Sequence, residues 1–161
     1  MTEPIREQVL VALQARLQSM TGIRQPWGTA YPSPPKVERS RLVPENPTQL
    51  PLLWVIEGAV DGVGSTVEIE VTAGGEVGLR HEFKVLLGAH IASAAGVTAP
   101  TWRQRLWHDV LVTLMAENTL DGLVMAIEWL PGAETNEGSA ETVATFVQPL
   151  NITFHETVTT D

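Results

Sequence analysis

Hydrophobic and polar residues recur along this chain with two periods, one typical of helices and one typical of strands. Within residues 4–20 the apolar positions are spaced by four and by three, which places them on one stripe of a helix. Pro4 fits the first turn of such a helix, and Gly22 fits a left-handed residue just after its end. The pattern predicts an amphipathic helix whose buried stripe is Ile5, Val9, Leu13, Leu17 and Met20.

A second helical pattern covers residues 98–117. Thr98 is a favourable N-cap, and Pro100 falls in the first turn, where a missing N–H is tolerated. The predicted apolar face is formed by Leu106, Val110 and Leu114 and is widened by Trp107, Leu111 and Met115.

Between these helices the apolar residues recur with the period of a strand. Residues 52–57 form a short continuous apolar run, as expected of a strand that is covered on both faces. Residues 66–72 alternate between two faces, with Val67, Ile69 and Val71 on one and Glu68 and Glu70 on the other. Gly74-Gly75 then offers a tight turn into a further strand, so residues 66–91 predict a β-hairpin.

The second strand of this hairpin is unusually long. Residues 77–91 alternate over fifteen positions, which at about 3.3 Å each would span roughly 50 Å. Two arrangements accommodate this length: the strand bends at Gly88, or the hairpin projects beyond the domain as an arm. A projecting arm with one apolar face needs a partner to cover that face.

The end of the chain returns to the strand period. Residues 123–130 and 142–158 both alternate, and Pro149 within the last run argues for a sheet edge or a bulge, because proline lacks the N–H that a ladder needs. Residues 25–51 are rich in proline, which predicts an extended segment. Within it, residues 37–43 resemble a short edge strand that places Arg39 and Arg41 on one face.

These elements together predict an α+β fold. We expect a mainly antiparallel sheet with two helices packed on one face, plus a projecting β-hairpin, with residues 1–161 forming one domain.

Composition narrows the range of functions. The chain has no cysteine, which excludes disulfides and thiolate sites, and no stretch approaches the roughly 20 apolar residues of a membrane span. Glu3 and Glu7 lie where an export signal would carry positive charge, so we expect folding in the cytoplasm. All of the net charge of −9 comes from residues 106–161, which hold nine acids and no Lys or Arg. An acidic surface of this kind either keeps the protein soluble or repels something anionic, such as DNA.

The sequence offers little catalytic chemistry. The four histidines lack metal-ligand spacing, and His81 falls on the apolar face of a strand, where a core histidine is the simpler interpretation. His108 and Asp109 are helix neighbours and should point apart. Glu68 and Glu70 could hold a hard cation, although a solvated strand face explains them equally. We therefore expect no catalytic residue, no cofactor and no metal; a small ligand-binding domain or enzyme that uses His81 and His108 is the alternative.

A different set of residues suggests contacts between proteins. Aromatic and arginine side chains outside a core pattern are enriched at interfaces. Six residues fit this description, with the two tryptophans lying outside the apolar stripes, and are the predicted interface with a second subunit or a partner: Trp27, Arg39, Arg41, Trp102, Arg103 and Arg105.

The order of features resembles that of the tail terminator (minor tail protein) family of long-tailed bacteriophages. The resemblance lies in the opening helix IREQVLVALQARL, the basic segment VERSRL, the strand LPLLWVIEG, the helix RQRLWHDVLVTLM, the turn LDG and the closing strand LNITFHE. It covers nearly the whole chain as pattern and order. The proline-rich insertion at 25–36 and the long strand at 77–91 depart from the family's compact pattern.

The resemblance implies a structural role without enzymatic activity. Family members form a ring, taken here as a homohexamer, that caps the tail tube, stops its polymerisation and joins it to the neck or connector protein. The implied location is the head-proximal end of the tail in a virion assembled in the host cytoplasm, with DNA passing through the ring without specific binding. A head-completion or neck protein and a tail tube subunit are the neighbouring alternatives.

Overall fold

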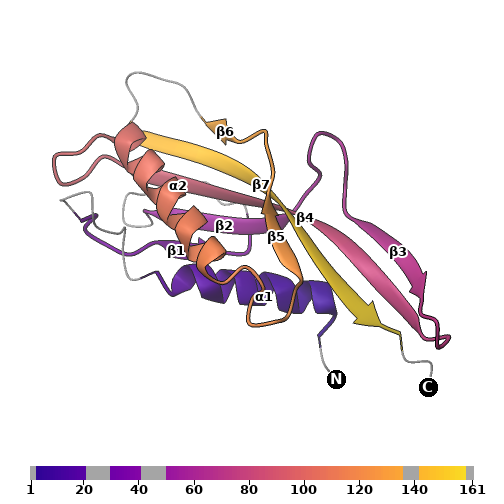
Figure 1. The fold of residues 1–161 in the computed structure, drawn as a ribbon. Coiled ribbons are helices and arrows are strands. Elements are labelled where there is room, and N and C mark those ends of the chain that lie inside the picture. Colours follow the sequence, from indigo (N-terminus) through magenta and orange to yellow (C-terminus); the bar gives the residue numbers. More distant parts are fainter. Residues whose placement is uncertain (1–2, 21–29, 41–49, 136–141, 159–161) are drawn as a thin grey trace.

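The protein is an α+β fold in which two helices pack on a mostly antiparallel sheet of seven strands (Figure 1). The computed structural model describes residues 3–20, 30–40, 50–135 and 142–158. The sheet order is β1-β2-β4-β7-β5; β3 adds to β4, and β6 adds to β7. Only β1 and β2 run parallel among the strands described. The elements are α1 (Ile5–Gln18), β1 (Lys36–Glu38), β2 (Leu52–Glu57), β3 (Thr66–Val71), β4 (Val77–Ala92), α2 (Ala99–Ala116), β5 (Ala126–Trp129), β6 (Glu134–Thr135) and β7 (Val143–Thr157).

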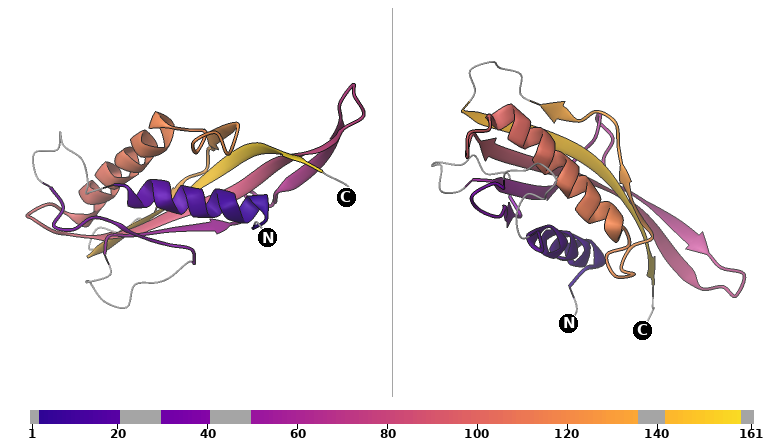
Figure 2. Two further views of the ribbon diagram at one scale, coloured as in Figure 1. Left: turned by 90° about the horizontal axis from the view of Figure 1, so that it is seen from below. Right: turned by 60° about the vertical axis from the view of Figure 1, so that its left-hand side comes forward.

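Both predicted helices are confirmed, and they lie on the same face of the sheet (Figure 2). The stripe of α1 buries Val9, Leu13 and Leu17 completely, as its spacing of four predicts. On α2, the positions Leu106, Val110 and Leu114 are likewise fully buried. The core therefore lies between the helix layer and the facing side of the sheet. No helix among the described residues is long and apolar enough to cross a membrane.

The long strand pair β4 and β7 forms the centre of the sheet. Fifteen residues of each pair in antiparallel register, from Gly78 opposite Thr157 to Ala92 opposite Val143. The strand β4 continues through Gly88 without interruption, and its first half extends past the helices together with β3 (Figure 2). The hairpin of β3 and β4 is thus the projecting arm, and we call residues 66–82 the arm.

Two strand predictions at the end of the chain need correction. The predicted strand 123–130 is shorter, because Leu120, Asp121 and Gly122 adopt positive φ and prolong the turn after α2, so that β5 begins at Ala126. Pro149 was expected at an edge or bulge, but β7 is an inner strand with neighbours on both sides.

The structure shows how an inner strand tolerates Pro149. The carbonyl of Pro149 accepts from the Leu130 N–H at 3.1 Å, so the missing N–H of Pro149 faces the same side, between β5 and β6. The side-chain amide of Gln148 donates to the Leu130 carbonyl at 2.7 Å in its place. A side chain thereby supplies the donor that proline lacks.

Candidate assembly surfaces

Among the described residues, the large apolar side chains with the highest exposed fraction lie on the arm. Ile69 and Val71 are 73% and 69% exposed. They share the face of the sheet that packs against the helices further along, but here no helix in the described part covers them (Figure 2). The stripe is completed by Val67, Val77 and Val158, which are also exposed. An exposed apolar patch of this kind indicates a contact surface.

The arm also presents an open strand edge. Within the described residues, β3 pairs with β4 on one side and has no strand on the other. Its outward backbone groups can therefore accept another strand or chain. An open edge beside an exposed apolar stripe is a combination that a second protein can cover.

Polar contacts hold the root of the arm against α1. His81 is buried and stacks on Phe154 with ring centroids 4.4 Å apart. Its Nε2 lies 3.0 Å from Glu156 Oε2, and its Nδ1 accepts from Arg6 Nε at 3.4 Å. Arg6 also pairs with Glu57 at 3.0 Å. The prediction of a satisfied core histidine is confirmed, and the contacts fix the direction in which the arm leaves the domain.

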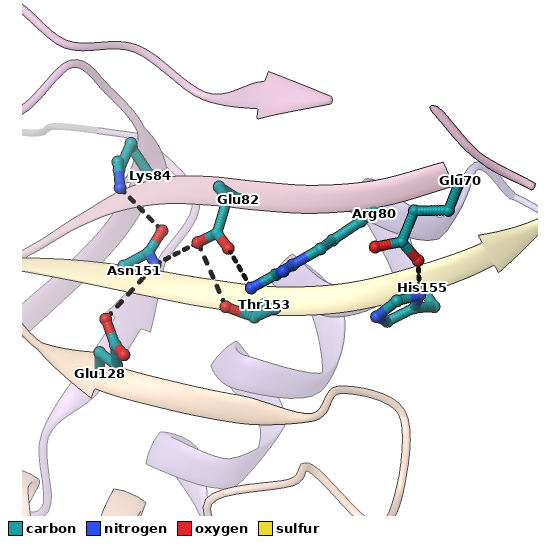
Figure 3. Close-up of polar contacts among 8 residues, drawn as sticks. All are labelled: Glu70, Arg80, Glu82, Lys84, Glu128, Asn151, Thr153 and His155. Carbon is teal, nitrogen blue, oxygen red and sulfur yellow. Dashed lines mark hydrogen bonds and ion pairs between the residues drawn. The ribbon is translucent and has the colours of Figure 1, made fainter. Parts of the chain in front are cut away.

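The sheet face away from the helices carries a connected polar network (Figure 3). Glu82 accepts from the side chains of Asn151 and Thr153 and pairs with Arg80 at 3.1 Å. Lys84 Nζ donates to Asn151 Oδ1 at 2.9 Å. These side chains come from β4 and β7, in directly opposed positions of the register.

The network reaches β5, and a separate polar contact joins β7 to β3. His155 on β7 lies 3.1 Å from Glu70 on β3, and Asn151 reaches Glu128 on β5 at 3.5 Å (Figure 3). The Asn151 hydrogen bond is the main cause that holds the pKa of Glu82 below its usual value; partial burial opposes it, and Thr153, Arg80 and Lys84 lower it further. Glu82 is therefore an ionised, fully engaged carboxylate, which suits a structural role.

Most acids of this face do not come from the acidic last third of the chain, although Glu128 on β5 does. Glu68, Glu70 and Glu82 belong to the arm. Of the acids after residue 105, Asp109 is buried in α2, and Glu117 binds Thr119 near the end of that helix. The excess of acids in residues 106–161 therefore does not predict which face of the sheet is acidic.

The structure places the predicted interface residues in different surroundings. Trp102 is fully buried, stacks edge-to-face with Tyr31 and donates from Nε1 to the Ala94 carbonyl at 2.9 Å. Since no exposed surface remains, its assignment to an interface is wrong. Arg103 and Arg105 are partly buried on α2, and the Arg105 guanidinium lies 4.9 Å from the centroid of the Trp102 ring. Their place in an interface stays a prediction. Trp27 and Arg41 lie outside the described residues.

Arg39 is engaged within the chain. Its two terminal nitrogens donate to the two carboxylate oxygens of Glu7 at 3.0 and 2.9 Å. This bidentate pair joins the end of β1 to α1, and the hydrogen bond lowers the pKa of Glu7. Its place in an interface stays a prediction, and the observed contact gives Arg39 a structural role.

The side chains of His108 and Asp109 lie closer together than their neighbouring positions on a helix predict. His108 Nδ1 and Asp109 Oδ1 lie 3.5 Å apart, although helix neighbours were expected to point in different directions. His108 is half-exposed whereas Asp109 is buried. The hollow of about 280 Å³ between α1 and the end of α2 is lined by Arg16, Glu117 and Asp121 and includes neither partner. Among the described residues, no group of three or more His, Asp or Glu side chains could hold a metal ion.

Comparisons with known proteins give a weak likeness in structure. No protein family and no curated protein matches the chain. A chain in the solved structure of the virion of a native gene transfer agent particle is similar, with a TM-score of 0.45 and 11% sequence identity. The match covers 96% of this chain and 100% of that chain. A likeness at this level does not say what this chain does.

Proposed function

We propose that this chain is a structural virion protein, a tail terminator that assembles into a homo-oligomeric ring on the end of a phage tail tube. The observation that carries the proposal is the projecting arm, whose apolar stripe and open edge require another protein to cover them. The order of sequence features that resembles the tail terminator family supports the same role. In this proposal the chain acts by contact and uses no catalytic residue, cofactor or metal.

A ring follows from the asymmetry of the subunit. The arm projects from one end of the sheet, past the two helices that cover the rest of one face (Figure 1). A contact between two different surfaces of identical subunits repeats head to tail, and it closes into a ring when the rotation between neighbours is suitable. The proposed number of subunits, six, comes from the family resemblance.

The polar network suits the wall of the ring's channel. The same sheet face, away from the helices, carries Glu68, Glu70, Glu82 and Glu128 together with Arg80 and Lys84. Because four carboxylates face two permanent cations, the side chains of this set have a net negative charge when His155 is neutral. A surface of this kind repels phosphates, so DNA would pass without being held.

Termination requires two different ends of the ring. One end binds the last ring of tail tube protein, and the other presents a surface that the next tube subunit cannot use and that the neck or connector protein can. The proposed place is therefore the head-proximal end of the tail. A neck protein would share the ring but not the capping activity, and a tube subunit would polymerise without limit.

Growth of tubes in vitro tests the proposal. The cognate tail tube protein is polymerised from short seeds, the purified chain is added in excess over tube ends, and tube lengths are measured by electron microscopy. We expect growth to stop and rings of this chain to mark one end of each tube. Tubes that grow on at the same rate, or tubes built from this chain alone, would contradict the terminator role.

A further inference from the structure

The arm has two open strand edges. β3 and the end of β7 lie on opposite sides of β4 (Figure 1). Within the described residues, β3 pairs only with β4, and β5 covers β7 no further than Thr153. Residues 154–157 of β7 therefore pair with β4 alone in that part of the chain. Because an open edge is a template for a further strand, the arm can accept a strand on each side.

The hydrogen bonds of β7 show which of its backbone groups face outward. The Val158 N–H donates to the Val77 carbonyl at 3.0 Å, toward β4, and the Thr153 carbonyl accepts at 2.8 Å from the residue before β5, on the other side. Since successive residues of a strand direct their backbone groups to alternate sides, His155 and Thr157 face away from β4. Their two N–H and two C=O groups meet no strand in the described part of the chain.

The edge of β3 carries groups of the same kind. The Thr72 N–H donates to the Glu76 carbonyl at 2.9 Å, inside the hairpin. By the same alternation, Val67, Ile69 and Val71 direct their backbone groups outward. β3 and β7 both run antiparallel to β4, so they are parallel to each other. Rotation about the axis of a ring preserves strand direction, and β3 of one subunit can thus meet β7 of the next only as a parallel strand.

We infer that β3 of one subunit pairs in parallel with residues 155–158 of β7 in the next subunit. Each subunit gives one edge and receives one, so the contact is heterologous and repeats around a ring. The three strands of every arm then continue into the next arm, and the sheet can close around the channel without leaving an edge. The inference rests on the proposed self-assembly and names the strands that join.

The position of β5 sets the register of this pair. Since β5 occupies the edge of β7 up to Thr153, the neighbour's β3 can begin only beyond that residue. With Thr66 opposite His155, all four outward groups of β7 find partners, because a residue in a parallel pair bonds to the residues before and after the one opposite it. The same register places Ile69 beside Val158, and both of these apolar side chains are exposed in the single subunit.

The side chains along the two edges favour a second copy of this chain as the partner. His155 Nδ1 lies 3.1 Å from Glu70, and its Nε2 has no partner among the described residues. In this register the neighbour's Glu68 lies diagonally across from that nitrogen, within reach of a long side chain and with complementary charge when the imidazole is protonated. Exposed apolar residues also flank both edges, with Val63 before β3 and Met125 before β5. The glutamates of β3 stay on the face proposed as the channel wall.

Disulfide cross-linking tests the pairing, because the natural chain has no cysteine. Ile69→Cys with Val158→Cys places one thiol on each edge, at exposed positions. Between subunits the two Cα atoms lie about 4.8 Å apart in the proposed register, which a disulfide spans, whereas within one subunit β4 separates them by roughly 10 Å or more. We expect mild oxidation to give covalent oligomers up to the whole ring on a denaturing gel.

Two controls locate the contact. Ile69→Cys with Met125→Cys keeps two exposed thiols, but Met125 lies at the start of the open edge, roughly 13 Å along β7 from Val158, so we expect little cross-linking. Ile69→Cys alone should stay uncross-linked. Covalent dimers from that single variant would indicate two β3 strands paired around a two-fold axis and would overturn the inference.

Proline at position 69 tests the backbone contact separately. The Ile69 N–H faces away from β4 and donates to the neighbour's Thr157 carbonyl in the inferred pair, so Ile69→Pro removes this bond and leaves the ladder with β4 intact. Ile69→Thr is the matched control, since it removes the same side chain and keeps the N–H. We expect Ile69→Pro to associate at least about 10-fold more weakly than Ile69→Thr in sedimentation velocity. Equal association of the two variants would contradict strand pairing; if Ile69→Pro loses its circular dichroism spectrum, the cysteine pair decides.

The outcomes separate this contact from the terminator role. Covalent rings from Ile69→Cys with Val158→Cys, together with uncross-linked controls, support the contact. No cross-linking of that pair, equal cross-linking with Met125→Cys, or a natural chain that is monomeric would overturn it. If the pair does not cross-link and the natural chain still caps tubes, the strand pairing falls but the terminator role stands; if the pair cross-links into rings and tubes still grow, the reverse holds.

Discussion

Gly88 allows a tryptophan side chain to pack directly on the sheet, on the face away from the helices. A Cβ atom built on Gly88 would lie 1.9 Å from Cζ2 of Trp54. Trp54 lies on β2, directly opposite Gly88. Its indole therefore packs against the backbone of β4. Because this close approach fixes Trp54, it also explains why the alternation of β4 includes a glycine at its centre.

We predict that Gly88→Ala destabilises the chain by about 1–3 kcal/mol, since the new methyl group must displace a buried indole ring. Urea unfolding followed by tryptophan fluorescence measures the change. Gly78→Ala is the matched control in the same strand, because its nearest neighbour would lie 3.6 Å away, at ordinary contact distance. An equal loss in both variants would refute the packing role of Gly88.

Gln148 and Pro149 form a coupled pair. The Gln148 amide donates to the carbonyls of Leu130 and of Pro149 at 2.7 and 2.8 Å. Gln148→Met keeps the volume and removes both donations, which should cost about 1–3 kcal/mol of the free energy of unfolding. Adding Pro149→Ala restores a backbone N–H toward Leu130 and should recover part of this loss. If the two substitutions have additive effects on urea unfolding, the Gln148 amide does not replace the missing N–H of Pro149.

Glu82 is expected to make the free energy of unfolding depend on pH. Its pKa is lower in the folded chain than in the unfolded chain, chiefly because Asn151 donates to it. Its contribution is therefore present above the unfolded pKa and is lost as the pH falls through the folded pKa. Glu82→Gln should cost about 1–2 kcal/mol at pH 7 and progressively less in acid.

Unfolding midpoints measured between neutral and acidic pH check this prediction. Glu128→Gln serves as the control, because Glu128 is exposed and its contact with Asn151 is 3.5 Å long. A difference between Glu82→Gln and the natural chain that stays constant with pH would show that the charge of Glu82 does not matter.

At the scale of elements, periodicity predicted the helices and the long strands well. The alternation of residues 77–91 gave β4 almost to the residue, because one face of that strand is buried along most of its length. Periodicity also applies to Trp102, which was predicted to lie at an interface. It lies four residues before Leu106 and so belongs to the buried stripe of α2. Its neighbours Arg103 and Arg105 drew attention to charge, and the spacing was the better guide.

Other features depend on contacts between residues distant in sequence. The inner position of β7 could not be predicted, since the compensation for Pro149 comes from the position of Leu130. The polar network joins β4, β5 and β7, a separate contact joins β7 to β3, and only the register brings Glu82 opposite Thr153. The apolar stripe of β3 was visible in the sequence, whereas the position of the two described helices, which do not cover it, is a property of the fold.

The stripe leads to a prediction about the arm as an element. Ile69→Thr with Val71→Thr keeps β-branched side chains at exposed positions, so the free energy of unfolding of the monomer should change by less than about 0.5 kcal/mol. Self-association should weaken at least about 10-fold, because the apolar contact with a neighbour is lost. Urea unfolding and sedimentation velocity measure the two quantities separately.

Val11→Thr is the matched control for this arm variant, Ile69→Thr with Val71→Thr. Val11 is 50% exposed on α1 and lies outside the arm. It should leave the oligomer unchanged. If the arm variant keeps the natural oligomer size, or if it loses stability as a core substitution would, the stripe is not a contact surface.

For the whole molecule, the account depends on polarity between its two ends. One end is an arm with exposed apolar side chains and an open strand edge, held at its root by the contacts of His81, and the rest of that sheet face is covered by the two helices. Identical subunits with two complementary ends associate head to tail, and closure of the ring limits their number. Limited self-association is therefore the claim on which the terminator role depends.

Sedimentation velocity of the natural chain over a wide range of concentrations tests that claim most directly. The account predicts one oligomer of fixed size, expected to contain six subunits, which replaces the monomer as concentration rises and does not grow further. A chain that stays monomeric at the highest concentration, or one whose oligomers lengthen without limit, would contradict it.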